Sequence, residues 1–160
     1  MNDEETTTAR DLRDTVREFI RSFGLLEEHR TPCGEPLRVP HAHALMVLFE
    51  RRDGQAPRIS ALGEHLELDK ANVSRLCHRM AEEGHVELRP CPDDGRAKRV
   101  HLTDAGAEVA STVDESSRAR FARLLDALDG ASADEVVEAI DSLNDAIRNL
   151  SSNTIGDPDD

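Results

Sequence analysis

Apolar residues recur at helical spacing in the first third of the chain. Among Leu12, Val16, Phe19, Ile20 and Phe23, each residue has another of the set three or four positions away, which is the period of one face of an α-helix. The stretch HRTPCGEPLRV then interrupts the period with Pro and Gly. A second helix is expected from Pro40, because proline suits the first turn of a helix.

Two shorter helices are predicted next. Ile59, Leu62 and Leu66 cover about two turns, and a second apolar face follows at Val73, Leu76, Cys77 and Met80. Asp69 lies just before the second helix and is a good N-cap residue. Gly84 follows the helix, where glycine ends helices in the left-handed conformation. The pattern is typical of a helix-turn-helix.

The period then changes from helical to alternating. HVELRP and RVHLT alternate apolar and polar residues, and CPDDG between them is a turn signal, so a β-hairpin is expected. Thr103 is predicted to cap a long helix that ends near Gly130, and Ser132 to cap the last helix. That helix carries a heptad-like seam at Val136, Ile140, Leu143, Ile147 and Leu150. The fold class is mainly α with a small β-hairpin.

The charge of the chain is strongly negative but unevenly distributed. The 160 residues carry a formal net charge of −13. Residues 58–102 hold 8 basic and 8 acidic side chains, a net charge of zero, whereas residues 103–160 hold 4 basic and 14 acidic ones, a net charge of −10. A segment that is neutral on average can still present one basic face, so the middle third is the part of the chain in which to look for a surface that binds a polyanion. An aromatic content of 2% argues against a base-stacking surface for single strands.

Composition excludes several other classes of protein. No apolar run approaches the roughly 20 residues that cross a bilayer, and the acidic start MNDEETTTAR does not resemble a signal peptide. Three Cys without a CxxC pair indicate no disulfide framework, so a cytoplasmic protein is expected. Gly-rich phosphate loops, HExxH and GxSxG are missing from the sequence, which argues against an enzyme.

The middle segment has the chemistry of a DNA-binding winged helix-turn-helix. A helix that enters the major groove needs side chains that reach base edges and phosphates, and a wing needs a cation at its tip for the minor groove. The predicted DNA contacts are Lys70, Asn72, Ser74, Arg75 and Arg79 on the helix and Arg96, Lys98 and Arg99 on the wing. Alternatives are a merely solvated polar face and a winged helix that binds a protein instead of DNA.

The run from NVSRLCHRM to HLTDAG resembles the multiple antibiotic resistance regulator (MarR) family. The matching pieces are Glu82/Glu83-Gly84, Arg89, Asp94-Gly95-Arg96 and Leu102-Thr103-Asp104-Ala105-Gly106. The resemblance implies a winged domain over residues 40–103, a helical dimerisation region over 10–30 and 104–150, and disordered tails at 1–9 and 151–160.

The same resemblance implies a function and roles for single residues. Such proteins are homodimers that bind palindromic promoter DNA, more often as repressors, and respond to a small effector. Arg96 would contact the minor groove. Asp94 would hold the wing by pairing with a nearby arginine, for which Arg89 is the candidate.

Cys33, His41 and His43 are the candidate sensor residues, and their chemistry stays open. Cys33 would be an oxidation sensor if a histidine lowered its pKa. Cys33 with His41 or His43, and with His29 or a glutamate, would bind zinc or a similar divalent metal. His-x-His turns the two rings about 200° apart on a helix, so only one faces a given metal. Otherwise the cluster is structural and a small organic ligand is the effector. We expect Cys77 to be buried and Cys91 exposed.

Overall fold

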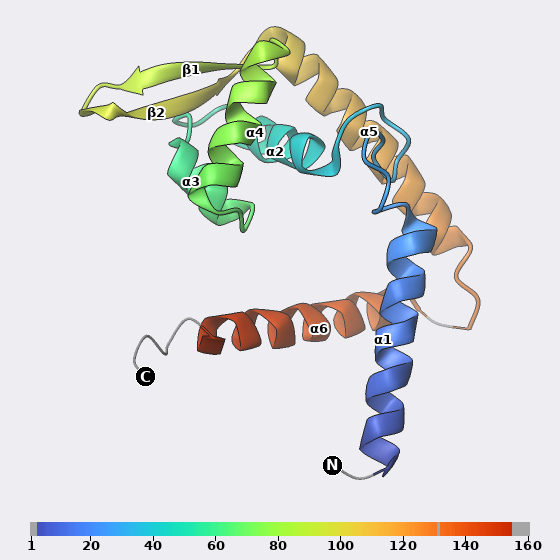
Figure 1. Ribbon diagram of the computed structural model, residues 1–160. Helices are drawn as coiled ribbons and strands as arrows, with labels where there is room; N and C mark the ends of the chain where they lie inside the picture. The colour runs from blue at the N-terminus through green and yellow to red at the C-terminus, as the bar shows by residue number, and fades with distance from the viewer. Residues whose placement is uncertain (1–2, 131, 155–160) are drawn as a thin grey trace, which may run out of the picture. The chain divides into compact units, whose positions relative to one another are not determined.

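The computed structural model describes residues 3–130 and 132–154, and it divides into two compact units at the boundary between Arg118 and Ala119. Figure 1 shows the elements in chain order. They are α1 (Asp3–Phe23), α2 (Val39–Glu50), α3 (Ile59–His65), α4 (Lys70–Glu82), β1 (Val86–Cys91), β2 (Asp94–Leu102), α5 (Asp104–Asp126) and α6 (Ala133–Thr154). The expected class, helices with one hairpin, is therefore confirmed.

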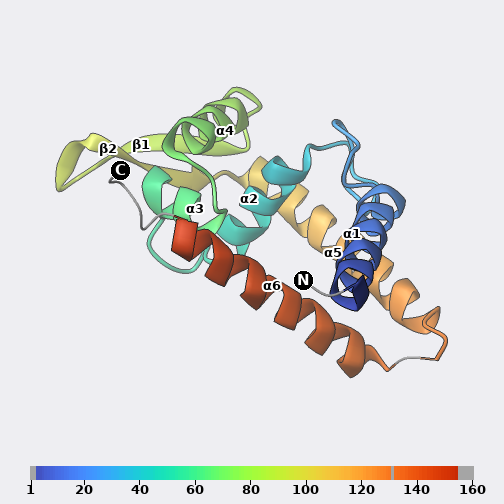
Figure 2. The ribbon, with the colours of Figure 1, turned by 60° about the horizontal axis from the view of Figure 1, so that its bottom comes forward.

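The winged part of the first unit is built around one apolar core. α3 contacts α4, α4 contacts β1, and α2 and α3 both contact β2, an arrangement that Figure 1 and Figure 2 show from two directions. Leu45, Leu62, Val73, Met80 and Val100 are among the fully buried side chains of this core. These residues come from α2, α3, α4 and β2, so the core holds the α4 helix against the hairpin.

Helix ends follow the residues that the sequence marks. The Asp69 carboxylate accepts a hydrogen bond from the backbone N–H of Asn72 at 2.8 Å, which caps α4. Gly84 has φ +78° directly after α4, the left-handed conformation that glycine adopts without strain. Thr103 caps α5 by accepting from the N–H of Gly106 at 3.0 Å, and Ser132 caps α6 by accepting from the N–H of Glu135.

The Asp69 cap predicts a pH-dependent contribution to stability. Hydrogen bonds to the carboxylate, first of all from the Asn72 backbone, lower the pKa of Asp69. The contribution is therefore complete above the unfolded pKa of about 3.9 and is lost as the pH falls through the lower folded pKa. Asp69→Asn keeps the cap acceptor but cannot titrate, so we expect a shallower loss of stability in acid. Urea midpoints of both proteins across this pH range measure the difference; parallel curves would contradict the cap assignment.

The hairpin is antiparallel and irregular at its tip. Val86 pairs with Leu102 at its base, and the register shifts between Pro90 and Cys91. Cys91 is 3% exposed, so the expectation that it is exposed was wrong. The shift in register accompanies the burial of this side chain at the end of β1, although its proline neighbours Pro90 and Pro92 are exposed.

The terminal helices extend into segments that the sequence analysis assigned to tails. α1 begins at Asp3 and α6 runs through Thr154, so residues 3–9 and 151–154 are helical. α6 continues past Leu150, the last apolar residue of the seam, and the Ser151 hydroxyl donates to the carbonyl of Ile147. The tail positions 1–2 and 155–160 lie outside the described residues. Within the described residues, no helix has both the length and the apolar character that crossing a bilayer requires.

Candidate nucleic-acid interface

α4 has one face in the core and one face in solvent. Val73, Leu76, Cys77 and Met80 are buried, as their spacing predicted. Of the predicted DNA contacts on this helix, Lys70, Asn72 and Arg75 are exposed, and Ser74 and Arg79 are partly buried. The exposed three lie in the first half of α4, the part of a recognition helix that reads base edges.

A short polar network orders the exposed face of α4. The Asn72 side-chain amide donates to the Asp69 carboxylate, and the Arg75 guanidinium donates to the Asn72 side-chain carbonyl at 2.7 Å. These bonds orient the Asn72 amide and the Arg75 guanidinium before any ligand arrives. An oriented amide and guanidinium suit hydrogen bonding to adenine and guanine edges in the major groove.

The tip of the wing carries an exposed arginine. Asp94 accepts a hydrogen bond from the backbone N–H of Arg96 at 3.1 Å, and in the described part of the chain no acidic side chain pairs with the Arg96 guanidinium. The expected ion pair between Asp94 and an arginine does not form, since Arg89 pairs with Glu87 at 2.7 Å instead. Asp94 supports the wing through the backbone because a tight turn brings N–H groups within its reach.

Arg99 has a different environment from Arg96. Its Nη1 donates to the carbonyl of Ala56 at 2.6 Å, and the backbone of Arg99 bridges to Arg58. The N–H of Val100 also donates to the carbonyl of Pro57. The guanidinium of Arg99 therefore ties the base of the hairpin to the segment before α3, whereas the sequence had grouped it with the DNA contacts.

A hollow lies between α3, the first half of α4 and the wing. Its volume is about 690 Å³, and its lining includes His78 and four basic side chains, those of Arg58, Lys70, Arg96 and Lys98. Glu64 and Glu67 line it as well. The two elements predicted to contact DNA, α4 and the wing, thus line one concave surface that carries basic side chains, as a surface that binds a phosphate backbone requires.

The three candidate sensor residues do not come together. His41 is buried and His43 is exposed, as two rings about 200° apart on a helix must be. Cys33 is partly buried, and its sulfur lies 3.0 Å from the Thr31 hydroxyl. The three do not form a group of potential ligands in the described residues.

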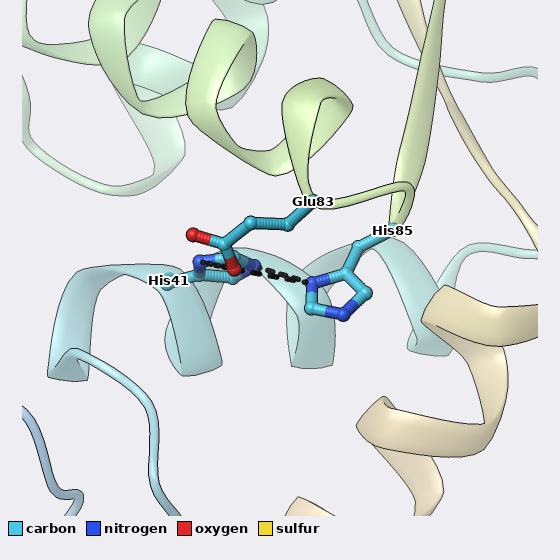
Figure 3. Close-up of side chains that lie close together, drawn as sticks. All are labelled: His41, Glu83 and His85. Atoms are coloured by element: carbon cyan, nitrogen blue, oxygen red, sulfur yellow. Dashed lines mark hydrogen bonds and ion pairs between the residues drawn. The ribbon is translucent and has the colours of Figure 1, made fainter.

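His41 instead meets two residues that the sequence analysis did not select. Figure 3 shows its ring against Glu83, directly after α4, and His85, before β1. His41 Nε2 lies 2.9 Å from His85 Nδ1, and His41 Nδ1 lies 3.5 Å from the Glu83 carboxylate. Burial is the main cause that lowers the pKa of His41, and the Glu83 carboxylate acts against it. The signal in the sequence was Glu83-Gly84-His85, where the C-terminal turn of α4 presents a carboxylate and an imidazole.

Thiol chemistry in the folded chain should be limited to Cys33. Cys77 is fully buried, and burial raises the pKa of its thiol to about 11; Cys91 is buried as well. Because the thiolate is the reactive form, we expect a disulfide reagent to modify one thiol per chain quickly and the other two only after denaturation. Cys33→Ser should remove the fast phase. A fast phase that persists in this variant would contradict the assignment.

Comparisons with known proteins agree with this geometry. Residues 37–97 match the sequence model of the MarR family. This segment of the chain, which holds α2, α3, α4 and β1, is therefore similar to the MarR family. The HTH-type transcriptional repressor IacR of Pseudomonas putida is 30% identical over 87 residues, which are 54% of this chain and 50% of that protein. The chain therefore spans about half the length of IacR in this match.

Two further comparisons extend over more of the chain. The uncharacterised HTH-type transcriptional regulator YkoM of Bacillus subtilis is 29% identical over 135 residues, 84% of this chain and 82% of that protein. The crystal structure of a probable transcriptional regulator from Pseudomonas aeruginosa matches with a TM-score of 0.66 at 21% sequence identity. The match covers 81% of this chain and 93% of the chain in that crystal structure. This likeness confirms the winged-helix fold. MarR-family proteins are transcription regulators, so the expectation that the chain is no enzyme is also confirmed.

Proposed function

We propose that this chain is a homodimeric MarR-family repressor that binds a palindromic operator in promoter DNA and releases or tightens it in response to a small effector. The observation that carries the proposal is the cationic hollow between α4 and the wing, with Lys70 and Arg96 on its lining. α4 would read bases through Asn72 and Arg75, and Arg96 would enter the minor groove. Since promoter DNA is the partner, the cytoplasm is the place of action.

Exposed apolar side chains on the outer helices support a homodimer. Leu12 and Phe19 on α1 are each 51% exposed, and Val137, Ile140 and Ile147 on α6 are also exposed. Apolar stripes of this kind on a single chain mark surfaces that another chain covers. Two copies would present two α4 helices, and a two-fold axis between them would match a palindromic operator.

The negative charge of the C-terminal part supports specific over general DNA binding. Residues 103–160 carry a net charge of −10, which repels phosphate from the surface of that part of the chain. Non-specific binding arises almost entirely from phosphate contacts and weakens with salt. The chain should therefore bind a random duplex poorly while the operator remains bound.

Fluorescence anisotropy of a duplex from upstream of the protein's own gene tests the proposal. The protein is titrated under reducing conditions, after sedimentation has established its oligomeric state. We expect a dimer that binds this duplex and discriminates against a random duplex at about 150 mM salt. Equal binding of both duplexes would contradict the charge argument. Failure to bind any duplex upstream of its own or neighbouring genes, even at low salt, would favour a winged helix that binds a protein partner.

A further inference from the structure

His41, Glu83 and His85 have the composition of a metal site. One ligand atom from each residue can be chosen so that all three lie within 4.8 Å of one another. Two imidazole nitrogens and a carboxylate oxygen are the ligand set of open zinc sites, in which water or a fourth side chain completes a tetrahedron. We propose that these three residues bind a divalent transition metal, with Zn²⁺ as the ion that fits the ligand set best.

The distances are close to those that a bound ion requires. In a tetrahedron with metal–ligand bonds of 2.0–2.1 Å, neighbouring ligand atoms are about 3.3 Å apart. His41 Nε2 and His85 Nδ1 are 2.9 Å apart, and the Glu83 carboxylate lies 3.8 Å from His85 Nδ1. The Glu83 carboxylate lies 3.5 Å from the other ring nitrogen of His41, Nδ1, so side-chain rotation would have to bring one nitrogen of His41, Nδ1 of His85 and the carboxylate around one ion, starting from atoms that already lie within 4.8 Å of one another. Without an ion, one of the two facing ring nitrogens must carry a proton to hydrogen-bond the other.

The backbone that carries two of the ligands is held in place. The N–H of His85 donates to the carbonyl of Met80 at 2.9 Å, and the N–H of Thr103 donates to the carbonyl of His85. The Thr103 hydroxyl donates to the carbonyl of Gly84 at 2.7 Å. The turn between α4 and β1 is thus fixed from both sides, and ligands on a fixed turn lose little entropy when a metal binds.

Access and burial also suit an ion. His41 is 3% exposed and His85 is 15% exposed, whereas the Glu83 side chain is 44% exposed. The ion would enter beside Glu83, next to a cavity of about 140 Å³ that His41, Glu83 and His29 line. His29, from the segment between α1 and α2, lines this cavity but does not belong to the group of three potential ligands, so water would complete the tetrahedron.

The position of the site connects it to the DNA-reading face. His41 also lines a second cavity of about 220 Å³, together with Asn72 and Arg79 of α4. An ion that fixes His41 and Glu83 therefore acts at both the start of α2 and the end of α4. A change in operator affinity follows if the bound geometry differs from the free one, and this step rests on the proposed function.

Zinc binding by the full-length, chelator-treated protein tests the site. A competition titration against a chromophoric chelator measures affinity, and Co²⁺ serves as a spectroscopic probe of tetrahedral coordination. We expect one ion per chain and no thiolate-to-cobalt charge-transfer band. Glu83→Gln and His85→Gln should each weaken binding roughly tenfold to a hundredfold or more.

Matched variants separate loss of a ligand from loss of structure. Glu82→Gln removes the neighbouring exposed carboxylate, and His43→Gln removes the exposed imidazole of α2; both should bind zinc like the wild type. If His85→Gln unfolds, Glu83→Gln decides, because its side chain is the most exposed of the three ligands. Unchanged zinc affinity in Glu83→Gln, or loss of binding in Cys33→Ser, would overturn the assignment.

The same samples test regulation separately from metal binding. We expect zinc to change the operator affinity of the wild type by roughly fivefold or more and to have little effect on Glu83→Gln. Zinc that binds without changing operator affinity would overturn the regulatory step. Zinc that binds to a protein without affinity for any duplex would refute the proposed function and leave the metal site intact.

Discussion

Replacing Gly106 with alanine is expected to lower the free energy of unfolding by about 2–4 kcal/mol, the range of a steric conflict in a packed site. Gly106 is buried in the first turn of α5. A Cβ atom built there would lie 2.0 Å from the carbonyl oxygen of His85 and 3.0 Å from Leu102 Cδ1. Alanine favours helices over glycine by about 1 kcal/mol, so the conflict must exceed that gain.

The backbone at His85 cannot move away cheaply. Its carbonyl accepts from the N–H of Thr103, and its N–H donates to Met80, so a shift would break the start of α5 or the end of α4. Gly95→Ala is the control, because a Cβ at Gly95 meets no heavy atom within 4 Å. Urea denaturation of both variants measures the effect. A Gly106→Ala protein as stable as the wild type would show that the approach of α5 to His85 is looser than the structure has it.

Replacing Arg96 with alanine is expected to weaken operator binding by about 1–3 kcal/mol, the scale of one good contact to a base edge. Arg96 is exposed at the wing tip and lines the cationic hollow. Because its side chain contributes nothing to the core, the free energy of unfolding should stay within about 0.5 kcal/mol of the wild type. Anisotropy titrations at several salt concentrations, with thermal unfolding in parallel, measure both quantities.

Two other arginines make this experiment specific. Arg17→Ala removes the same charge from the exposed surface of α1 and should leave operator affinity nearly unchanged. Arg99→Ala removes the hydrogen bond to Ala56 and should lower stability first, with any loss of DNA binding a consequence of a displaced hairpin. If Arg96→Ala binds the operator like the wild type, the wing does not enter the minor groove.

Most of the architecture could be read from the sequence because it depends on neighbouring residues. The caps at Asp69, Thr103 and Ser132 act on backbone groups three residues away, and Gly84 ends α4 through its own φ angle. The buried face of α4 follows from apolar spacing alone. Such signals need no knowledge of the rest of the fold, which is why the elements and the exposed polar face of α4 were predicted well.

The chemistry of single side chains depended on contacts that no local pattern contains. The acidic partner of His41 was left as an unnamed glutamate, and His85 was not considered at all, since it stands 44 positions away. Arg99 was predicted to contact DNA, but its guanidinium donates a hydrogen bond to the carbonyl of Ala56, 43 positions earlier in the chain. Cys91 was expected to be exposed but is buried. The alternation of apolar and polar residues does not reveal a register shift such as the one between Pro90 and Cys91.

The sequence by itself thus determined the elements, their ends, the polar face of α4 and the cation at the wing tip, since each arises from interactions within a few residues. Only the tertiary structure decided which distant side chains meet. The packing of α2 against α4 and the hairpin brought His41 to Glu83 and His85. Such a meeting depends on how whole elements pack, and the free energy of that packing is spread over the entire core.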